Sequence, residues 1–250
     1  MHLLITRPQP EADALAAHLA TRGVASTIDP LLVIKLSAPH SVDLEGVQAL
    51  IATSRNGLRG LALSPALEAA KRLPIYVVGP GTASYATELG FTAIITGPGS
   101  AGDLVELITR DCSPTAGPLL HLSGDKIAFD LAAALAPAGL RIDRRVVYRS
   151  VASAALLPMT LVRLNDGTID TVILTSPLAA ATFVAHVQAQ RIIERCQRLV
   201  YICLSQGIAT RLRPLNPVYV HVAPLPNSQS TLEIIDAMVA REIARAVEVP

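Results

Sequence analysis

Aromatic residues are scarce in this sequence: tryptophan is absent, and phenylalanine, tyrosine and tryptophan together make up 3% of 250 residues. Because 51% of the residues are nevertheless hydrophobic, alanine, leucine, valine and isoleucine must fill the core. Small aliphatic side chains are typical of helices that pack closely on buried parallel strands. A chain of this length can bury one large core or two ordinary ones, and we expect two. The composition therefore favours an α/β protein of two lobes.

An excess of charge is also missing, because 21 lysine and arginine residues face 20 aspartate and glutamate residues, which leaves a formal charge of +1. So small an overall field does not attract a nucleic-acid backbone, and an anionic ligand must be held by local groups. The sequence has an odd number of cysteines, and no two of them have C-x-x-C spacing: Cys112, Cys196 and Cys203. This argues against a disulfide framework and against a zinc site. We expect reduced and mostly buried cysteines.

Membrane and export signals are lacking as well. The long uncharged stretches 171–190 and 214–232 carry serine, threonine, histidine, glutamine and several prolines, which argues against a transmembrane span. Arg7 interrupts the apolar start before it reaches the length of a signal-peptide core. We expect a cytoplasmic protein.

Several catalytic signatures are missing too. The sequence contains no P-loop and no G-x-S-x-G elbow, and its six histidines lack the spacing of metal ligands. No cysteine has a recognisable activating partner. These absences argue against nucleotide hydrolysis and covalent nucleophilic catalysis. They indicate a chemistry of positioning or of weak acids, with no metal and no organic cofactor.

An internal duplication is the main pattern that is present. A strand, helix and glycine pattern that starts at Leu3 returns at Leu119, 116 positions later. In a second pattern, residues 50–54 match residues 172–176, which lie 122 positions later. Further along the same pattern, residues 89–90 match residues 215–216 at an offset of 126. The closing helix of the pattern starts at Leu104 in one copy and at Leu232 in the other, an offset of 128. Offsets that grow slowly are what insertions and deletions between two copies of one unit produce. Each copy alternates apolar strands with amphipathic helices, which is typical of a parallel doubly wound sheet.

Candidate binding residues lie where the predicted strands end. We predict strands at 3–6, 49–53, 75–78, 93–96, 119–122, 171–175, 199–203 and 219–222. In parallel sheets, ligands bind beyond the carboxyl ends of the strands, where helices begin. Six residues fall at such ends: Thr6, Ser54, Gly79, Ser123, Ser176 and Ser205.

Three motifs at these ends leave a ligand role and a structural role open. In Thr6-Arg7-Pro8 the hydroxyl can cap a helix while Arg7 faces a cleft, but threonine caps are common. Thr53-Ser54 and Thr175-Ser176 take equivalent places in the two copies, which favours a ligand role. The turn from Gly79 to Thr82 can bring backbone amides close to an anion, or it can be a tight turn that needs glycine.

The loop Gly97–Gly102 is the main rival signal, because it matches G-x-G-x-x-G and Asp125 follows at about the expected distance. A dinucleotide site normally uses the opening strand-to-helix turn of its domain, whereas this loop follows an internal strand. A glycine-rich helix start with Ser100 and Asp103 explains the loop equally well. A nicotinamide or other dinucleotide enzyme is therefore an alternative.

A second cluster surrounds the apolar run 146–148, which we interpret as an extended segment that joins the lobes. Its cationic members are Arg141, Arg144, Arg145 and Arg149. Solvated arginines are the simpler interpretation of the cluster, whereas Tyr148 in a hinge strand is a candidate functional residue.

In order and spacing along the whole chain, these motifs resemble the uroporphyrinogen-III synthase family. The set consists of Thr6-Arg7-Pro8, Thr53-Ser54, Gly79 with Thr82, Val147-Tyr148-Arg149 and Thr175-Ser176-Pro177. The resemblance implies two similar α/β lobes, each a parallel sheet flanked by helices, joined by a two-stranded β linker. One lobe would comprise 1–35 and 150–250, the other 38–146, and the linkers 36–37 and 147–149. The implied reaction cyclises hydroxymethylbilane to uroporphyrinogen III, with inversion of ring D and loss of water, in haem and other tetrapyrrole biosynthesis.

The resemblance also implies roles for individual residues. Tyr148 corresponds to the family's functionally important tyrosine and is expected to assist departure of the substrate hydroxyl as a hydrogen-bond donor. The expected substrate-binding residues are Thr6, Arg7, Ser54, Gly79, Thr82, Ser123, Thr175, Ser176 and Ser205. At 203–209 the sequence departs from the family, because Ser205 replaces a glycine and Ile208 replaces a hydroxyl residue. Ser205 is kept as a candidate, and Ile208 is not.

The expected partners are the linear tetrapyrrole substrate, with its many carboxylates, and transiently hydroxymethylbilane synthase. Nucleic acid and membrane are not expected partners, and we expect a monomer. A non-catalytic two-lobed binder of small anions is a further alternative, since it would share the glycine turns and have no need for Tyr148.

Overall fold

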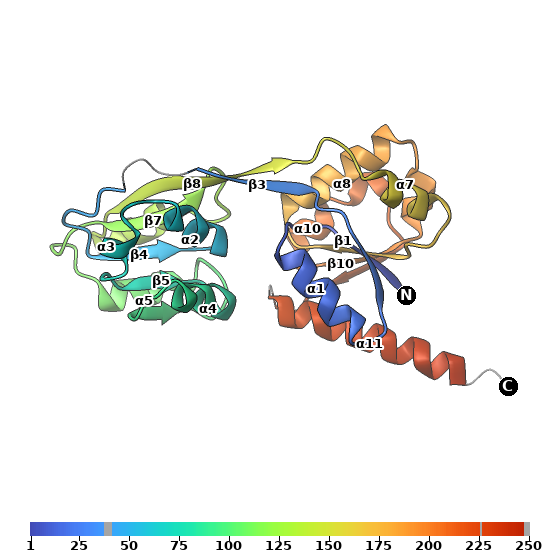
Figure 1. The fold of residues 1–250 in the computed structure, drawn as a ribbon, viewed down its shortest axis with the longest axis horizontal. Coiled ribbons are helices and arrows are strands. Elements are labelled where there is room, and N and C mark those ends of the chain that lie inside the picture. The colour runs from blue at the N-terminus through green and yellow to red at the C-terminus, as the bar shows by residue number, and fades with distance from the viewer. Residues whose placement is uncertain (38–41, 226, 248–250) are drawn as a thin grey trace. The chain divides into compact units, whose positions relative to one another are not determined.

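The computed structural model describes residues 1–37, 42–225 and 227–247, and it divides into two compact units (Figure 1). Unit 1 consists of Met1–Val33 and Val151–Pro250, and unit 2 of Ile34–Ser150. The chain crosses between the units in two neighbouring strands, β3 (Leu32–Leu36) and β8 (Ile142–Ala152). The N–H of Ser37 donates to the carbonyl of Val147, and the N–H of Ser153 donates to the carbonyl of Leu31, so the two strands are antiparallel.

Unit 1 is built on a five-stranded parallel sheet with the order β11-β10-β9-β1-β2. Its strands are β1 (His2–Ile5), β2 (Ala25–Ile28), β9 (Thr171–Leu174), β10 (Val200–Cys203) and β11 (Tyr219–Val222). The central strands are apolar on both faces, as expected where helices cover both sides of a parallel sheet.

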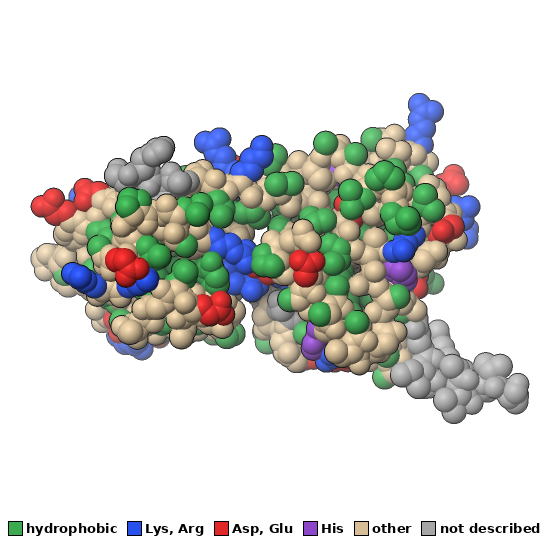
Figure 2. All heavy atoms as spheres, viewed as in Figure 1, with side chains coloured by type: hydrophobic (Ala, Val, Ile, Leu, Met, Phe, Trp, Pro, Cys, Tyr) green, Lys and Arg blue, Asp and Glu red, His purple; other side chains and the backbone are tan. Residues whose placement is uncertain are grey.

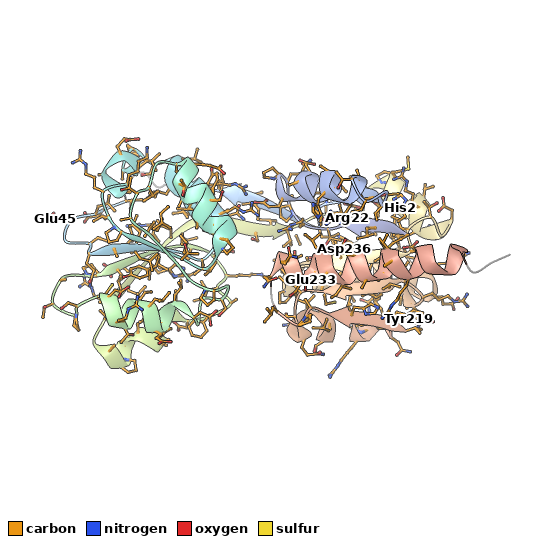
Figure 3. All side chains as sticks on the ribbon, turned by 90° about the horizontal axis from the view of Figure 1, so that it is seen from below. His2, Arg22, Glu45, Tyr219, Glu233 and Asp236 are labelled. Carbon is orange, nitrogen blue, oxygen red and sulfur yellow. The ribbon has the colours of Figure 1, made fainter. Side chains whose placement is uncertain are left out.

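Two groups of helices cover the faces of this sheet. On one face, Leu4 and Val172 contact α7 (Pro158–Asn165), α8 (Pro177–Ala189), α9 (Ile193–Gln197) and α10 (Gln206–Thr210), which a 3₁₀ turn follows at Arg213–Leu215. On the other face, Leu3 and Ile173 contact α1 (Glu11–Ala20) and α11 (Ser228–Val247). Arg22, after α1, pairs with Asp236 of α11 at 2.6 Å, as the labelled side chains in Figure 3 show.

Unit 2 repeats this architecture on a six-stranded sheet with the order β3-β8-β7-β4-β5-β6. Its further strands are β4 (Ala49–Ala52), β5 (Ile75–Val77), β6 (Ile94–Thr96) and β7 (Leu119–Gly124). One face packs on α2 (Arg55–Ala62), α3 (Leu67–Ala70) and α4 (Pro80–Glu88). The other face packs on α5 (Leu104–Asp111) and α6 (Leu131–Leu135), which a 3₁₀ turn follows at Ala136–Ala138. The α/β class expected from the sequence is confirmed.

Strand registers confirm the internal duplication. In unit 1 Leu3 pairs with Thr171, and in unit 2 Leu119 pairs with Ala49, which are the positions that the offsets of 116 and 122 relate. The order of the outer strands is also the same in both sheets. In the sheet of unit 1, the places held in unit 2 by β8, β5 and β6 are taken by β2, β10 and β11. The two sheets therefore share one topology, entered by the chain at different points.

Some elements differ from the sequence prediction. All eight predicted strands are present, but β2 and β3 were not predicted, and β8 extends well beyond the run 146–148. These strands carry few buried side chains, so their apolar pattern is weak. Helix α1 begins at Glu11 instead of next to Thr6, since Pro8 and Pro10 delay it. No helix among the described residues has both the length and the apolarity needed to cross a membrane.

Helix α2 contacts its sheet through two glycines. A methyl group on Gly60 would lie 2.6 Å from Cβ of Val147, and one on Gly57 would lie 2.5 Å from the carbonyl oxygen of Leu122. Both distances are far below van der Waals contact, so only glycine permits the helix to lie this close to β7 and β8. This close packing fixes the start of α2 at the end of the sheet.

We expect the Gly60→Ala substitution to lower the free energy of unfolding of unit 2 by about 1–3 kcal/mol, because overlap with Val147 outweighs the better helix propensity of alanine. Urea unfolding followed by circular dichroism measures the change. Gly81→Ala in α4 is the matched control, since a methyl group there meets no atom within 4 Å. Equal stability of the two variants would contradict the packing argument.

Candidate functional site

Polar residues gather in each unit at the carboxyl ends of the parallel strands, here called the carboxyl edge of that unit. In unit 2, the adjacent strands β8, β7, β4 and β5 bring to this edge Tyr148, Ser123, Ser54 and Gly79. In unit 1, the adjacent strands β1, β9 and β10 bring to the corresponding edge Thr6, Thr175 with Ser176, and Ser205. The structure thus collects the predicted residues into two groups, one in each unit.

Tyr148 is held in place by two neighbours in unit 2. Ser54 is the N-cap of α2, where its Oγ accepts from the N–H of Gly57 at 3.4 Å and donates to the phenol oxygen of Tyr148 at 3.0 Å. The ring lies against Gly124, where a methyl group would be 2.8 Å from two ring carbons. Because Ser54 donates to the phenol oxygen, the phenol hydrogen stays available for a ligand. An accepted hydrogen bond also strengthens the phenol as a donor.

Ser123, a predicted substrate-binding residue, is engaged in hydrogen bonds within unit 2. Its side chain is buried, and its Oγ accepts from Nε of Arg144 at 2.8 Å and lies 3.1 Å from the carbonyl of Gly124. The same guanidinium donates to the carbonyls of Gly124 and Asp125 at 2.5 and 2.8 Å. Ser123 therefore positions Arg144 and shapes the turn beneath Tyr148, so it is not a free donor for a substrate. Arg144 is exposed, as the simpler interpretation of the sequence has it, but its guanidinium is engaged by these three groups.

His121 is a buried residue of the same edge that sequence reasoning missed. It is 3% exposed, its Nε2 lies 3.3 Å from Oγ1 of Thr53, and it is paired in register with Arg144. Burial and, secondarily, the charge of Arg144 lower the pKa of His121 to about 4. Comparison of the two copies could have identified His121, because the residues of unit 1 equivalent to His121 and Arg144 are Ile5 and Ile28. A polar pair in unit 2 thus replaces an apolar pair in unit 1.

The glycine turn after β5 forms the start of α4. The N–H groups of Thr82 and Ala83 both return to the carbonyl of Gly79, at 3.1 and 3.0 Å. Pro80 has no N–H, and the N–H of Gly81 donates to no backbone carbonyl within the described chain, so this amide is open at the helix start. Thr82 is buried. This turn can accept an anion at one amide.

The rival loop Gly97–Gly102 is closed on itself. Ser100 donates from both its N–H and its Oγ to the carboxylate of Asp103, at 2.9 and 2.7 Å. A methyl group on Gly97 would lie 2.8 Å from the side chain of Leu104, so this glycine serves helix packing. The N–H of Ser100 therefore already donates to the Asp103 carboxylate. Because a pyrophosphate would need this N–H as a donor, the loop is disfavoured as a dinucleotide site.

The carboxyl edge of unit 1 consists mainly of hydroxyls. Thr6 is fully buried and donates to the carbonyl of Ile173 at 2.6 Å, so it ties β1 to β9 and does not cap a helix. Ser176 caps α8 by accepting from the N–H of Ala179 at 3.1 Å. Half-buried Thr175 and Ser205 make no side-chain hydrogen bond within the residues described, and half-buried Arg7 follows Thr6. The hydroxyls of Thr175 and Ser205 are therefore the ones that a ligand can reach as donors.

The charged side chains and the cysteines offer no metal site within the described residues. Acidic and basic side chains are interspersed over the face seen in Figure 2. The part of the chain that the structure describes holds no group of three or more histidine, cysteine or acidic side chains placed for a metal ion. Cys196 and Cys203 are buried and free, as expected, and burial raises the pKa of each thiol to about 12. Neither cysteine is an activated nucleophile.

Comparison with known proteins gives one consistent result. The family model described as "Uroporphyrinogen-III synthase HemD" matches residues 13–233. A crystal structure of uroporphyrinogen-III synthetase from Helicobacter pylori 26695 has a TM-score of 0.62 at 18% identity, and covers 95% of this chain and 99% of its own. A mutant uroporphyrinogen III synthase from the extremely thermophilic bacterium Thermus thermophilus has a TM-score of 0.56 at 17% identity, covering 96% and 99%. A search of curated proteins by sequence found no match.

We expect His121 to make unit 2 less stable in acid. Its pKa is about 4 in the folded chain against an ordinary value of 6.5, so the unfolded chain binds the proton more tightly. The free energy of unfolding therefore falls as the pH drops from about 6.5 towards 4, by about 2 kcal/mol between pH 7 and pH 5. His121→Gln removes this part of the pH dependence, which denaturant unfolding at both pH values measures.

The control for this experiment is His221→Gln, because His221 is exposed on β11. This variant should keep the full pH dependence of the wild type. If His121→Gln and the wild type lost equal stability between pH 7 and pH 5, His121 would not be held neutral by burial.

Proposed function

This chain belongs to the uroporphyrinogen-III synthase family, and from this premise we propose how its residues perform the family's reaction. The enzyme cyclises hydroxymethylbilane to uroporphyrinogen III, with inversion of ring D and loss of water, in tetrapyrrole biosynthesis. The match over residues 13–233 carries this assignment. The hydrogen bond from Ser54 to Tyr148 supports the roles proposed below.

Tyr148 is the proposed donor to the departing hydroxyl. The terminal C–O bond of hydroxymethylbilane breaks, and the oxygen leaves as water, so it must gain a proton. A hydrogen-bond donor assists this step as negative charge develops on the oxygen, and the pyrrole carbon that forms the new bond loses a proton in return. The phenol of Tyr148 can donate a hydrogen bond to the leaving oxygen. Ser54 donates to the phenol oxygen, so the phenol hydrogen stays free for the substrate. A positioned weak acid of this kind is a general acid catalyst. The pyrrole nitrogen stabilises the resulting cation, so the enzyme mainly has to impose the geometry of ring closure.

Substrate carboxylates are the proposed ligands of the remaining edge groups. The bilane carries acetate and propionate side chains on all four rings, whereas the chain has a formal charge of only +1. Local donors must therefore bind these anions. In unit 1 we assign this role to Thr175, Ser176, Ser205 and Arg7. Thr175 and Ser205 have hydroxyls without partners in the described chain, and Ser176 opens the 13-residue helix α8.

In unit 2 the proposed carboxylate ligands are Gly79 and Thr82. The open amide of Gly81 lies between them at the start of α4, where the helix dipole favours an anion. Ser54 acts through Tyr148. Thr6 and Ser123, predicted as direct ligands, are assigned structural roles instead, because their hydroxyls are engaged with Ile173 and Arg144.

Several finer properties complete the proposal. Because water is lost from a C–O bond during ring closure, the reaction class is that of a cyclising carbon–oxygen lyase. The three free cysteines suit a reducing compartment, and we place the enzyme in the cytoplasm. We propose that the chain acts as a monomer without metal or organic cofactor. It would receive its unstable substrate through transient contact with hydroxymethylbilane synthase.

We expect Tyr148→Phe to lower kcat roughly a hundredfold, the lower end of the usual effect of a general acid catalyst, with little change in KM. The loss follows from removal of the donor to the leaving hydroxyl. A coupled assay with freshly made hydroxymethylbilane, followed by isomer analysis of the oxidised porphyrins, measures both the rate and the product. Tyr85→Phe is the matched control, since this half-buried tyrosine of α4 contacts Arg59 through its ring.

The same assay separates the enzyme from a binder of small anions. A binder would leave only the type I isomer, which forms when the bilane closes unaided. Formation of the type III isomer by the wild type supports the activity. Full turnover by Tyr148→Phe would overturn the proposed role of the phenol, but it would leave the assignment of the activity unchanged.

A further inference from the structure

A large hollow lies in unit 1 at the edge opposite to its carboxyl edge. Its volume is about 840 Å³, within the usual range for small-molecule sites. It is lined by residues of the segments 164–170 and 188–199, which precede β9 and β10. Strands of four residues separate this hollow, here called the arginine pocket, from the carboxyl edge by roughly 13 Å.

Three guanidinium groups dominate the charge of the arginine pocket. Arg191, Arg195 and Arg198 all line it and all are exposed. Within the described chain, none of the three makes an ion pair or a side-chain hydrogen bond, whereas Arg22, Arg110 and Arg141 each pair with an aspartate. Clustered guanidinium groups in a concave surface are suited to bidentate binding of carboxylates.

The acidic residues of the arginine pocket do not neutralise these arginines. The carboxylate of Asp170 accepts from the N–H of His2 at 3.1 Å and from Oγ1 of Thr171 at 2.7 Å, and it lies 3.7 Å from the amino terminus. Its oxygens are therefore already engaged by these donors. Glu194 is exposed and forms no ion pair with an arginine in the part of the chain that the structure describes. A net positive hollow results.

Apolar side chains, together with Asn165, Gln188 and Gly167, make up the remainder of the lining. Leu164 and Leu199 are buried, and Ile192 and Ile193 are half-buried members of the core beneath the pocket. A ligand that fills the hollow would thus meet a hydrocarbon floor and a cationic rim. This pairing suits a molecule with an apolar body and several carboxylates better than it suits a small inorganic anion.

The duplication shows that the fold itself does not require an open cationic hollow here. Helix α3 and Gln48 of unit 2 take the places of α9 and Asp170 of unit 1. There, Nε2 of Gln48 donates to the carbonyls of Ser113 and Gly117, so a loop is bound over the equivalent place. Two cations follow α3: Lys71 pairs with Glu68 at 2.6 Å, and exposed Arg72 takes the place of Arg198, whereas Arg191 and Arg195 have no cationic equivalent. The arginine cluster is therefore a feature of unit 1 and not of the shared fold.

We propose that the arginine pocket is a second, non-catalytic binding site for an amphiphilic polycarboxylate, the chemical class of the enzyme's own tetrapyrroles. This inference rests on the function assigned above. The arginines bind the carboxylate side chains at the rim, and the pyrrole body covers the aliphatic floor. Such a site lets the enzyme retain or sense its product on a surface remote from the carboxyl edge.

Equilibrium titration with uroporphyrin III, the stable oxidised form of the product, tests the proposal. We expect two binding events in the wild type and one in R191Q/R195Q/R198Q. The control R72Q/R211Q/R213Q removes the same charge from three other exposed arginines and should keep both events. The single variant R195E, which changes one exposed side chain, should weaken the second event at least tenfold. Turnover and the type III product should stay at wild-type level in every variant.

Three results would overturn the proposal. The first is a single binding event in the wild type, and the second is two unchanged events in the triple variant and in R195E. The third is a second event that inorganic phosphate or ADP abolishes at concentrations similar to those of uroporphyrin III, which would assign the pocket to phosphates. Failure of the enzymatic function is distinguished separately, because it would appear as the lack of type III isomer in the wild-type assay.

Discussion

Parallel pairing between strands that are remote in the chain holds each unit together. In unit 1, β1 pairs with β9, and the Thr6 hydroxyl adds a bond to the carbonyl of Ile173 at the end of that pair. In unit 2, β4 pairs with β7 in the equivalent register. Because side chains alternate between the faces of a sheet, this register decides which residues enter each core and which polar residues reach the same carboxyl edge. The site depends on it for that reason.

The duplicated scaffold carries different chemistry at its two edges. Unit 1 presents the hydroxyls of Thr175, Ser176 and Ser205 at helix starts, which are suited to binding carboxylates. Unit 2 presents a phenol that Ser54 orients, and it pairs buried His121 with exposed Arg144 where unit 1 has two isoleucines. Helix and strand placement is common to both copies, so the differences lie mainly in the side chains. The edges that we propose for carboxylate binding and for the reaction can diverge in this way without a change of fold.

Much of the fold was predictable because its strands are short, apolar and separated by glycine-ended helices. The strands around Leu3, Ile51 and Ile173 have both faces buried, so their composition is unambiguous. The missed strands β2 and β3 have few buried positions, and the long β8 mixes arginines with apolar residues, so composition does not mark them. Candidate site residues were found by their position after strands. Their roles were not, since Ser123 and Ser205 look alike in sequence although one is engaged and the other has no partner in the described chain.

The sequence by itself determined the α/β class, the duplication, the positions of the site residues along the chain and the resemblance to a family, because composition, periodicity and order are properties of neighbours along the chain. Only the tertiary structure decided which hydroxyls are consumed by hydrogen bonds, that His121 is buried beside Arg144, and that three arginines share one hollow. Each of these facts depends on groups brought together by strand and helix packing. Their hydrogen-bond partners, burial and local charge are set by distances in space, which the order of residues does not specify.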